Sequence, residues 1–505
     1  MASTCQPSQG ADMNLLDRFF MAVAPGRAMQ REKSRTIAMH YRAARLGRRN
    51  DGLKASGSDA DLASRDRRQV SFYARDMIRN TPFARRVQDV VSGHVVGDGI
   101  IPKLQVSTGL PQALQENLRR RGLEMIEEHL DTTAIDKNGL LNLYGLQALA
   151  MNTVVESGEV LIRRHRPIGA PLTIPLQLEV LEPEYLDDSR WGGFLDGNEI
   201  REGIEYDRES GERVAYWLYT QHPGGEWRPG HNPMTSERVP ADEILHLFRV
   251  DRPGQTRGIS WFTPIAEKLV NADDAEDAHL MRQKIAACFT AFHRLGADGG
   301  RERQELGGTL QPGVIMEIAN DEEMEFAEPP AVGDYPDFMK NVLRAAAMGI
   351  GLTYEALTGD LSGVNFSSAR IGRLEMERNI SRWQWLMIIP MLLQPLGRWI
   401  EEAWIEEEFE EAWDLPGAIR FTWVPPHRIL VDPAREFGAL REAVRSGFQS
   451  RQGVVRQLGL DPERLLAEQQ QDKDEADRLG LPFDSDPRAD VSRQNANFSD
   501  EGSTP

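Results

Sequence analysis

The run Thr358 to Arg370, T-G-D-L-S-G-V-N-F-S-S-A-R, separates two strongly helical segments of this 505-residue chain. It combines glycines and hydroxyl side chains with a single carboxylate, Asp360, and is too polar to form a core. A loop poor in charge but rich in hydrogen-bonding groups can touch a moving polyanion without gripping it, whereas clustered Lys and Arg bind phosphate firmly. The sequence therefore predicts an exposed polar loop between two helices.

A long helix, a small module and a returning helix are predicted upstream of this loop. Trp261 to Phe292 is almost free of Gly and Pro after the start signal Pro264, and predicts one helix of roughly 45–50 Å. Leu295 to Pro330 is interrupted by Gly and Pro, with a strand-like piece at Val314 to Ile318, and Tyr335 to Gly349 is again helical.

The predicted long helix carries an acidic collar. Its members are Asp273, Asp274, Glu276 and Asp277. A solvated helix face is the simpler interpretation of such a run, and a function follows only if the helix lines something. Asp273 and Asp277 lie one helical turn apart and would share a face.

Downstream of the loop, Ala369 to Trp413 predicts the longest helical stretch, with kinks expected at Pro390 and Pro395. Its end, Glu401 to Asp414, holds eight acidic residues and no basic one, which is typical of a solvated helix face. Further predicted elements are a strand at Ile419 to Val424 and helices at Asp432 to Gly447 and Arg451 to Leu479.

The part before Ser260 predicts a mixed α+β body behind a basic arm. Met1 to Val90 contains 17 Lys and Arg against 9 Asp and Glu, although the whole chain has a formal charge of −19. Residues 1–60 lack periodicity and predict a mobile arm. The predicted helices are Asp61 to Val91, in two pieces divided at Thr81-Pro82, Gln112 to Leu130 and Leu140 to Ser157; the predicted strands are Ile100 to Val106, Val160 to Ile162, Leu176 to Val180, Val214 to Leu218 and Ile244 to Phe248.

Length and cysteine content limit the classes of protein to which this chain can belong. A chain of 505 residues is expected to form two to four compact units. Cys5 and Cys288 are its only cysteines, which favours a reducing compartment and no disulfide. The most apolar run, Trp383 to Leu393, is too short to span a bilayer, so we predict a protein of cytoplasmic origin without a membrane anchor.

Motifs for catalysis, cofactors and metals are missing from the sequence. There is no phosphate-binding P-loop, no H-E-x-x-H and no G-x-S-x-G, and the G-D-G of residues 97–99 predicts a plain turn. His222 and His231 flank a loop that could hold a metal, but exposed loop histidines are the simpler interpretation, and Cys288 predicts a buried structural thiol. We therefore predict no catalytic residue, no cofactor and no metal.

Several phrases, in order, resemble the portal proteins of tailed bacteriophages, in particular the lambda-like group. They cover most of the chain from Asp61 to Leu481. The matching stretches are Arg79-Asn80, Val96 to Ile100, Arg238 to Ala241, His246 to Phe248, Pro253 to Gly258 before Trp261, Lys284 to Ala287, Leu310 to Gly313, Gly359-Asp360, Asn365 to Arg370 and Val431 to Pro433.

The resemblance implies an α+β portal fold assembled as a ring, usually of twelve subunits, at one capsid vertex. The implied parts are a basic arm (1–60), a wing (61–259), a stem helix (260–294), a clip (295–334), a second stem helix (335–357), a tunnel loop (358–368), a tunnel helix with the remainder of the wing (369–430), crown-like helices (431–481) and a disordered tail (482–505).

The same resemblance implies which residues meet which partner. Candidates for contact with double-stranded DNA in the channel are Asp273, Asp277, Thr358, Gly359, Asp360, Ser362, Asn365, Ser367 and Ser368. The clip candidates for partner binding are Arg301, Arg303 and Glu305. The implied partners are the terminase large subunit, the major capsid protein and head-completion or tail adaptor proteins; the implied location is the virion, with assembly in the host cytoplasm.

Two other functions stay open at this point. The abundance of carboxylates in a mixed fold is compatible with a cytosolic acidic hydrolase using a carboxylate pair. The basic arm is compatible with a DNA-binding regulator, whose salt-sensitive binding would depend on residues 1–61.

Overall fold

The computed structural model describes the chain with gaps. The described residues are 57–63, 66–192, 194–195, 197–225, 234–288, 292–294, 323–325, 335–408, 417, 419–426, 433–458, 460 and 462–480. Met1–Ala63 and Ser64–Pro505 form two separate compact units, and α3 (Ala60–Ala63) is the helix described in the first of them. Among the described helices none is both apolar enough and long enough to cross a bilayer.

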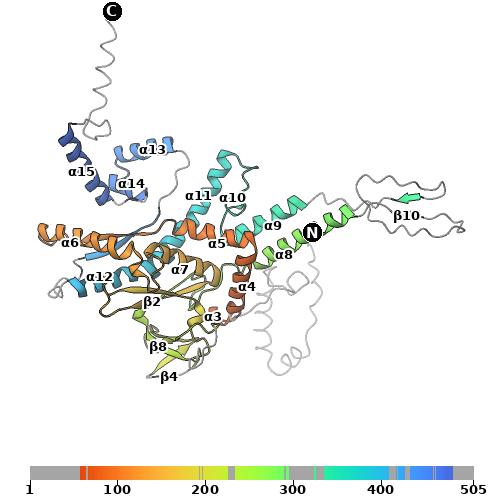
Figure 1. Cartoon of the computed structure of the whole chain (residues 1–505), viewed down its shortest axis with the longest axis horizontal. Coiled ribbons are helices and arrows are strands. Elements are labelled where there is room, and N and C mark those ends of the chain that lie inside the picture. The colour runs from red at the N-terminus through yellow and green to blue at the C-terminus, as the bar shows by residue number, and fades with distance from the viewer. Residues whose placement is uncertain are drawn as a thin grey trace, which may run out of the picture. The chain divides into compact units, whose positions relative to one another are not determined.

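Helices and strands alternate through the first part of the second unit, which confirms the predicted mixed α+β class (Figure 1). Its helices are α4 (Arg67–Asn80), α5 (Pro82–Val95), α6 (Gln112–Met125), the π-helix η2 (Ile126–Leu130), the short 3₁₀ turn η3 (Thr133–Ile135) and α7 (Leu143–Ser157). Its strands are β1 (Ile101–Val106), β2 (Glu159–His165), β3 (Gln177–Leu181), β4 (Phe194–Leu195), β5 (Asn198–Arg201), β6 (Ile204–Tyr206), β7 (Arg213–Tyr219), β8 (Ser236–Pro240) and β9 (Ile244–Phe248), with 3₁₀ turns η4 (Pro183–Tyr185) and η5 (Ala241–Glu243).

The strands form separate small sheets. Strand β2 lies between β3 and β9, antiparallel to both, and β4 to β8 follow one another in a five-stranded antiparallel sheet. Strand β1 pairs antiparallel with β12 (Ile419–Val424), from the far end of the chain, with Ile101 opposite Val424. The strands predicted near 160, 178, 216 and 246 are confirmed, whereas the short strands β4, β5 and β6 and the largely polar strand β8 were not predicted.

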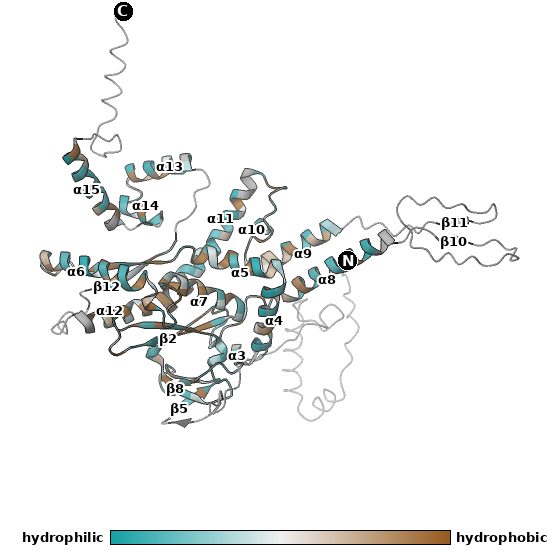
Figure 2. Cartoon of the chain, in the orientation of Figure 1, coloured by the Kyte–Doolittle hydropathy of each residue, from teal (hydrophilic) through white to brown (hydrophobic). Residues whose placement is uncertain are grey.

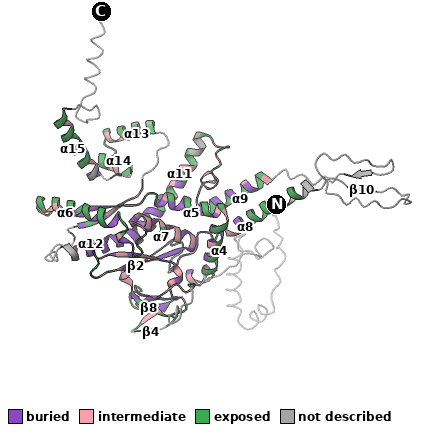
Figure 3. Ribbon diagram, viewed as in Figure 1, coloured by how far each residue is buried: buried purple, intermediate pink, exposed green. Residues whose placement is uncertain are grey.

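One large core joins the helices to the three-stranded sheet. Helix α7 lies at its centre, with Met151, Val154 and Val155 fully buried, and Figure 3 shows this helix mostly buried. A smaller cluster around Tyr216 and Leu218 fills the space beneath the five-stranded sheet.

The second half of the chain is mostly helical. Its elements are α8 (Ala266–Cys288), β10 (Phe292–Arg294), β11 (Glu323–Glu325), α9 (Tyr335–Ile350), α10 (Tyr354–Thr358), α11 (Phe366–Trp383), the π-helix η6 (Gln384–Leu393), α12 (Gln394–Glu408), α13 (Pro433–Arg445), α14 (Arg451–Gln457) and α15 (Pro462–Leu479). Helices α11, η6 and α12 follow one another without a break, and Pro390 lies inside η6.

The predicted helix from Trp261 to Phe292 is too long. Trp261, Phe262 and Ile265 are buried core residues in a series of turns, and Thr263 donates its hydroxyl to the carbonyl of Ser260. Helix α8 therefore begins at Ala266 and, with 23 residues, is about 35 Å long.

Two further predicted helices are interrupted. The segment 335–357 is divided at Gly351, which has a φ of 88° and closes α9. A Cβ at this glycine would lie 2.9 Å from the side-chain nitrogen of Asn379, so the chain turns where another residue would collide. The segment 451–479 is likewise two helices, because Pro462 begins α15.

Candidate functional site

Helices α8 and α9 form an antiparallel pair. Near one end the rings of His279 and Tyr335 stack with centroids 4.1 Å apart, and near the other a Cβ on Gly349 would lie 2.5 Å from Ile265. The strands β10 and β11 lie between the two helices in the chain, and they pair antiparallel, with Phe292 opposite Glu325. The predicted order of helix, strand-containing module and returning helix is thus present in the described residues.

The acidic collar lies on the exposed side of α8. Asp273, Asp274, Glu276 and Asp277 are all exposed, whereas Leu269 and Ala272 are buried. Figure 2 shows hydrophilic and hydrophobic residues alternating along this helix. Glu276 adds to the effect of desolvation in raising the pKa of Tyr335, so this end of the helix pair lies in a negative field.

The loop after α10 is tightly hydrogen-bonded. Thr358 is the last residue of α10, and Gly359 follows in the left-handed conformation, with a φ of 72°. The carboxylate of Asp360 accepts hydrogen bonds from the backbone N–H and hydroxyl of Ser362, at 3.0 and 2.6 Å, and from the hydroxyl of Tyr354 at 3.2 Å. The bonds from Ser362 lower the pKa of Asp360, so this carboxylate is ionised and fixed in a turn.

The loop is shorter than predicted. Helix α11 begins at Phe366 rather than at Ala369, so Ser367 and Ser368 are helical residues. The exposed residues between the two helices include Gly359, Ser362 and Asn365. The structure therefore brings together five of the predicted channel residues, Thr358, Gly359, Asp360, Ser362 and Asn365, and places two at the start of the next helix.

The sequence analysis missed a basic surface at the base of this loop. Lys340 and Arg344 lie one turn apart on α9, with their cationic groups 5.8 and 5.5 Å from the ring centroid of Tyr354. Lys340 also contributes to the lowered pKa of Asp360. Spacing of i and i+4 on a predicted helix was the signal that could have identified this pair.

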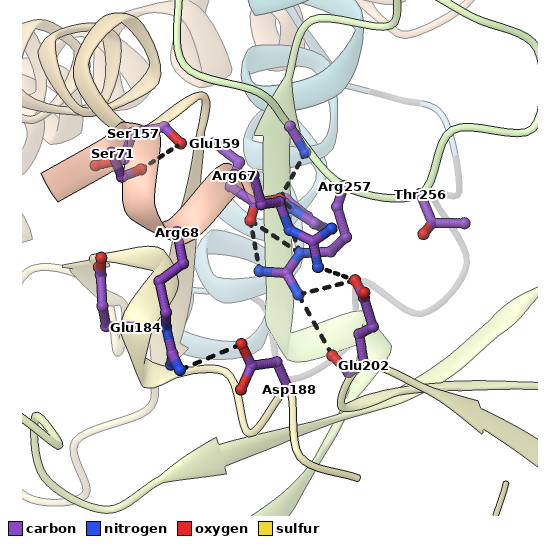
Figure 4. Close-up of polar contacts among 12 residues, drawn as sticks. Arg67, Arg68, Ser71, Ser157, Glu159, Glu184, Asp188, Glu202, Thr256 and Arg257 are labelled. Carbon is purple, nitrogen blue, oxygen red and sulfur yellow. Dashed lines mark hydrogen bonds and ion pairs between the residues drawn. The ribbon is translucent and has the colours of Figure 1, made fainter. Parts of the chain in front are cut away.

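A buried ionic cluster forms around Glu159 and includes Arg257, which belongs to one of the stretches that resemble portal proteins (Figure 4). Glu159, only 2% exposed, accepts hydrogen bonds from Arg257 at 2.5 to 3.0 Å, from the backbone of Gly258 at 2.7 Å and contacts His246 at 2.9 Å. Burial raises the pKa of Glu159, but Arg257 and His246 outweigh burial and lower it. Burial lowers the pKa of His246 to about 4, so the imidazole is neutral at pH 7.

Two further ion pairs border this cluster. Arg67 contacts Glu202, and Arg68 lies 3.4 Å from Asp188 (Figure 4). Arg257 also lies 3.6 Å from Glu202. The cluster thus connects α4, β2 and the loop before α8. A glutamate at an inward-facing strand position was the sequence signal for it.

His222 is not the exposed loop histidine that we predicted. It is half-buried, lies 2.9 Å from Glu182 and packs edge-on against Tyr185. Glu182, Glu184 and His222 bring their ligand atoms within 4.8 Å of one another, a grouping with the chemistry of a metal site. The guanidinium of Arg75 already lies among these carboxylates, 2.9 Å from Glu184 and 3.5 Å from Glu182.

Other predicted residues lie outside the described part of the chain. These are Arg301, Arg303 and Glu305, the strand-like piece 314–318, His231, the side chain of Cys288, most of the basic arm and the tail 482–505.

A family model described as phage portal protein, lambda family, matches residues 46–384. Since this match covers well over half of the sequence, the chain belongs to the lambda family of phage portal proteins. Its function is the conduit at a capsid vertex through which the phage genome is packaged, retained and ejected. Proteins of this family are structural as a rule, and family membership gives no support to the hydrolase alternative.

Curated relatives agree with the family. The chain is 26% identical over 483 residues to a probable portal protein of Halomonas phage phiHAP-1, covering 90% of each chain. It is 20% identical to portal protein B of Escherichia phage lambda, covering 81% of this chain and 84% of the relative. Among solved structures, the neck of an empty gene transfer agent particle matches 85% of this chain and 99% of the other at 16% identity, with a TM-score of 0.47.

Proposed function

We propose that copies of this chain close into a ring, of twelve subunits by family expectation, with the conduit along the ring axis. Helices α8 and α9 are the stem, the segment between them is the clip, and the body before Ser260 is the wing. Residues 358–368 are the tunnel loop, the helix after them is the tunnel helix, and α13 to α15 are the crown. The antiparallel α8–α9 pair, followed by the short helix α10 and then by the hydrogen-bonded polar loop, is the observation that carries this assignment.

The second part of the proposal concerns contact with DNA. The loop residues Thr358, Gly359, Asp360, Ser362 and Asn365 and the acidic pair Asp273 and Asp277 face the duct, joined by Ser367 and Ser368 at the start of α11. Neutralising many phosphates releases counterions and stabilises a complex, which would stall a moving duplex. An ionised, hydrogen-bonded Asp360 repels phosphate instead, while the nearby cations of α9 lie against Tyr354.

The third part concerns partners and the energy source. The clip, with Arg301, Arg303 and Glu305, docks the terminase large subunit and later the head-completion or tail adaptor proteins, and the wing contacts the major capsid protein. ATP hydrolysis belongs to the terminase, so this chain carries out no catalysis. Assembly takes place in the host cytoplasm before the portal is enclosed in the capsid vertex.

Size-exclusion chromatography with light scattering, followed by negative-stain imaging of the same fraction, tests the ring. We expect a single large species whose images show an annulus with a central opening. A monomer or dimer at every protein and salt concentration would contradict the proposal, and would bring the enzyme alternative back.

A further inference from the structure

A large groove runs along α11 and the start of η6. Its cavity volume is about 1360 Å³, and the end of α5, the turn after it, β12 with the two prolines that follow it, and α14 form the other walls. Residues that line it include Arg373, Arg378 and Arg382 on α11 and Trp385 and Leu386 on η6.

The groove is positively charged on balance, because four arginines, including Arg456 of α14, line it against the two carboxylates of Asp98 and Glu377. Arg373 pairs with Glu377 at 3.2 Å, but Arg378 and Arg382 make no ion pair with any residue in the described part of the chain. Both are exposed. The field reaches the half-buried His94 in the same groove, whose pKa is lowered by burial and then by the charges of Arg373 and Arg86. An occupant of this groove should therefore be anionic.

The same groove exposes apolar side chains. Leu374 is 44% exposed, Trp385 56% and Leu386 70%. Large exposed apolar residues that gather beside cations mark a protein-binding surface rather than one for a polyanion alone. The occupant should combine carboxylates with aromatic or aliphatic side chains.

One segment of the chain has this composition. Residues 406–414 read E-E-E-F-E-E-A-W-D, with six carboxylates, no basic residue and the aromatic residues Phe409 and Trp413. The segment begins at the end of α12, since α12 includes Glu408.

The acidic segment cannot reach the groove of its own subunit. Arg378 and Glu408 belong to one uninterrupted succession of helices, and the 30 positions between them correspond to about 45 Å. The ten residues after Glu408 return to Ile419, which starts the strand that packs along α12, where Glu401 accepts the backbone N–H of Phe421 at 2.8 Å. A ten-residue connection held at both ends extends only about 17 Å away from them.

We propose that the acidic segment 406–414 of one subunit docks in the arginine groove of the next, and that this contact helps to close the ring. The inference rests on the proposed ring. The groove arginines lie on α11, whereas the acidic segment begins in the last turn of α12. Because these are two different surfaces, the contact is heterologous, and heterologous contacts generate rings when the rotation closes. Carboxylates pair with Arg378 and Arg382, while Phe409 and Trp413 cover Trp385 and Leu386.

Charge reversal in the full-length chain tests the contact. The groove variant carries Arg378→Glu and Arg382→Glu, and the segment variant carries Glu410→Lys and Glu411→Lys. We expect each to raise the protein concentration needed for ring formation, measured by light scattering, about tenfold or more, and the four-substitution variant to return to within about threefold of the natural chain. The change Trp413→Ala should weaken assembly without altering its salt dependence.

Controls separate this contact from general charge effects and from misfolding. Arg119→Glu with Arg120→Glu on α6 introduces the same charge change away from the groove and should leave assembly unchanged. Circular dichroism melts of all variants should coincide at concentrations below assembly, because the reversed groove arginines are exposed.

Four outcomes would overturn the inference. Rings that form normally in both reversal variants would leave the ring proposal standing and remove this contact from it, as would a four-substitution variant no better than the worse parent. A groove variant that forms rings but loses binding to duplex DNA would make the groove a nucleic-acid surface. If the natural chain itself forms no ring, the proposed assembly fails first and the contact fails with it.

Discussion

Removal of Arg257 is the most direct test of the buried ionic cluster. Glu159 and Arg257 are both almost fully buried, with side chains 2% and 5% exposed, and the guanidinium makes three contacts of 2.5 to 3.0 Å with the carboxylate. Arg257→Met keeps much of the side-chain volume but leaves the carboxylate without its main counter-charge. Breaking a buried pair on one side costs about 3–5 kcal/mol. Because His246 and the Gly258 backbone still contact Glu159, we expect a loss near 3 kcal/mol.

Urea unfolding of the full chain, followed by circular dichroism below the assembly concentration, measures this loss. The matched control is Arg249→Met, which breaks the largely exposed pair with Asp251 at 2.9 Å and removes the guanidinium that lies 4.6 Å from the ring centroid of Trp261; it should cost about 1 kcal/mol. The double variant Glu159→Gln with Arg257→Met should recover part of the loss, because no buried charge remains unpaired. Equal stability of the Arg257→Met and Arg249→Met variants would refute the role given to the cluster.

Three further predictions concern pH, the loop and a buried glycine. The pKa of His246 is about 4 in the folded protein and near 6.5 in the unfolded chain, so the unfolded chain takes up the proton first as the pH falls. The contribution of neutral His246 to the free energy of unfolding should therefore be fully present above pH 6.5 and fall by up to about 3 kcal/mol toward pH 4. The change His246→Gln should flatten the curve of urea midpoint against pH between these values. Asp360→Lys and Asn365→Lys should leave rings intact but reduce the number of genome-filled heads about tenfold, because a cation in the loop would bind phosphate. Asp360→Asn keeps a side-chain oxygen that accepts the backbone N–H of Ser362 and should package the genome nearly normally. Unchanged packaging in the lysine variants would exclude the loop from the mechanism. Gly158→Ala should cost more than about 2 kcal/mol in thermal melts, because φ is 90° and the new Cβ would lie 2.3 Å from the Ile259 backbone, while Gly139→Ala, with a φ of 66° in open space, should cost about 1 kcal/mol.

Hydrophobic period predicted the elements whose burial pattern is regular. Helix α7 and strands β2, β9 and β12 lie where the sequence placed them, because their apolar residues recur at the spacing of the buried face. Strand β8, S-E-R-V-P, has only Val239 buried and is polar elsewhere, so it carries too little periodic signal to be recognised.

Breaks in helices were harder to predict than helices. Trp261, Phe262 and Ile265 suit a helix by composition, but they are held in the core as turns, which only tertiary packing decides. Gly351 ends α9 because Asn379, distant in sequence, occupies the space next to it. The positively charged surface beside the loop was missed for a similar reason, since Lys340 and Arg344 contact Tyr354 only after the chain has turned back.

The pairing of β1 with β12 bears on how the protein is made. Strand β1 can pair only after β12 has been synthesised, because Ile101 lies opposite Val424, about 320 residues later in the chain. At about 5–20 residues per second, a ribosome needs roughly 15–65 s to deliver the missing strand. During that interval Leu104 and Val106, buried in the finished molecule, have no strand beside them. We therefore expect β1 of the nascent polypeptide to be prone to self-association, and chaperones to reduce that association, until translation is nearly complete.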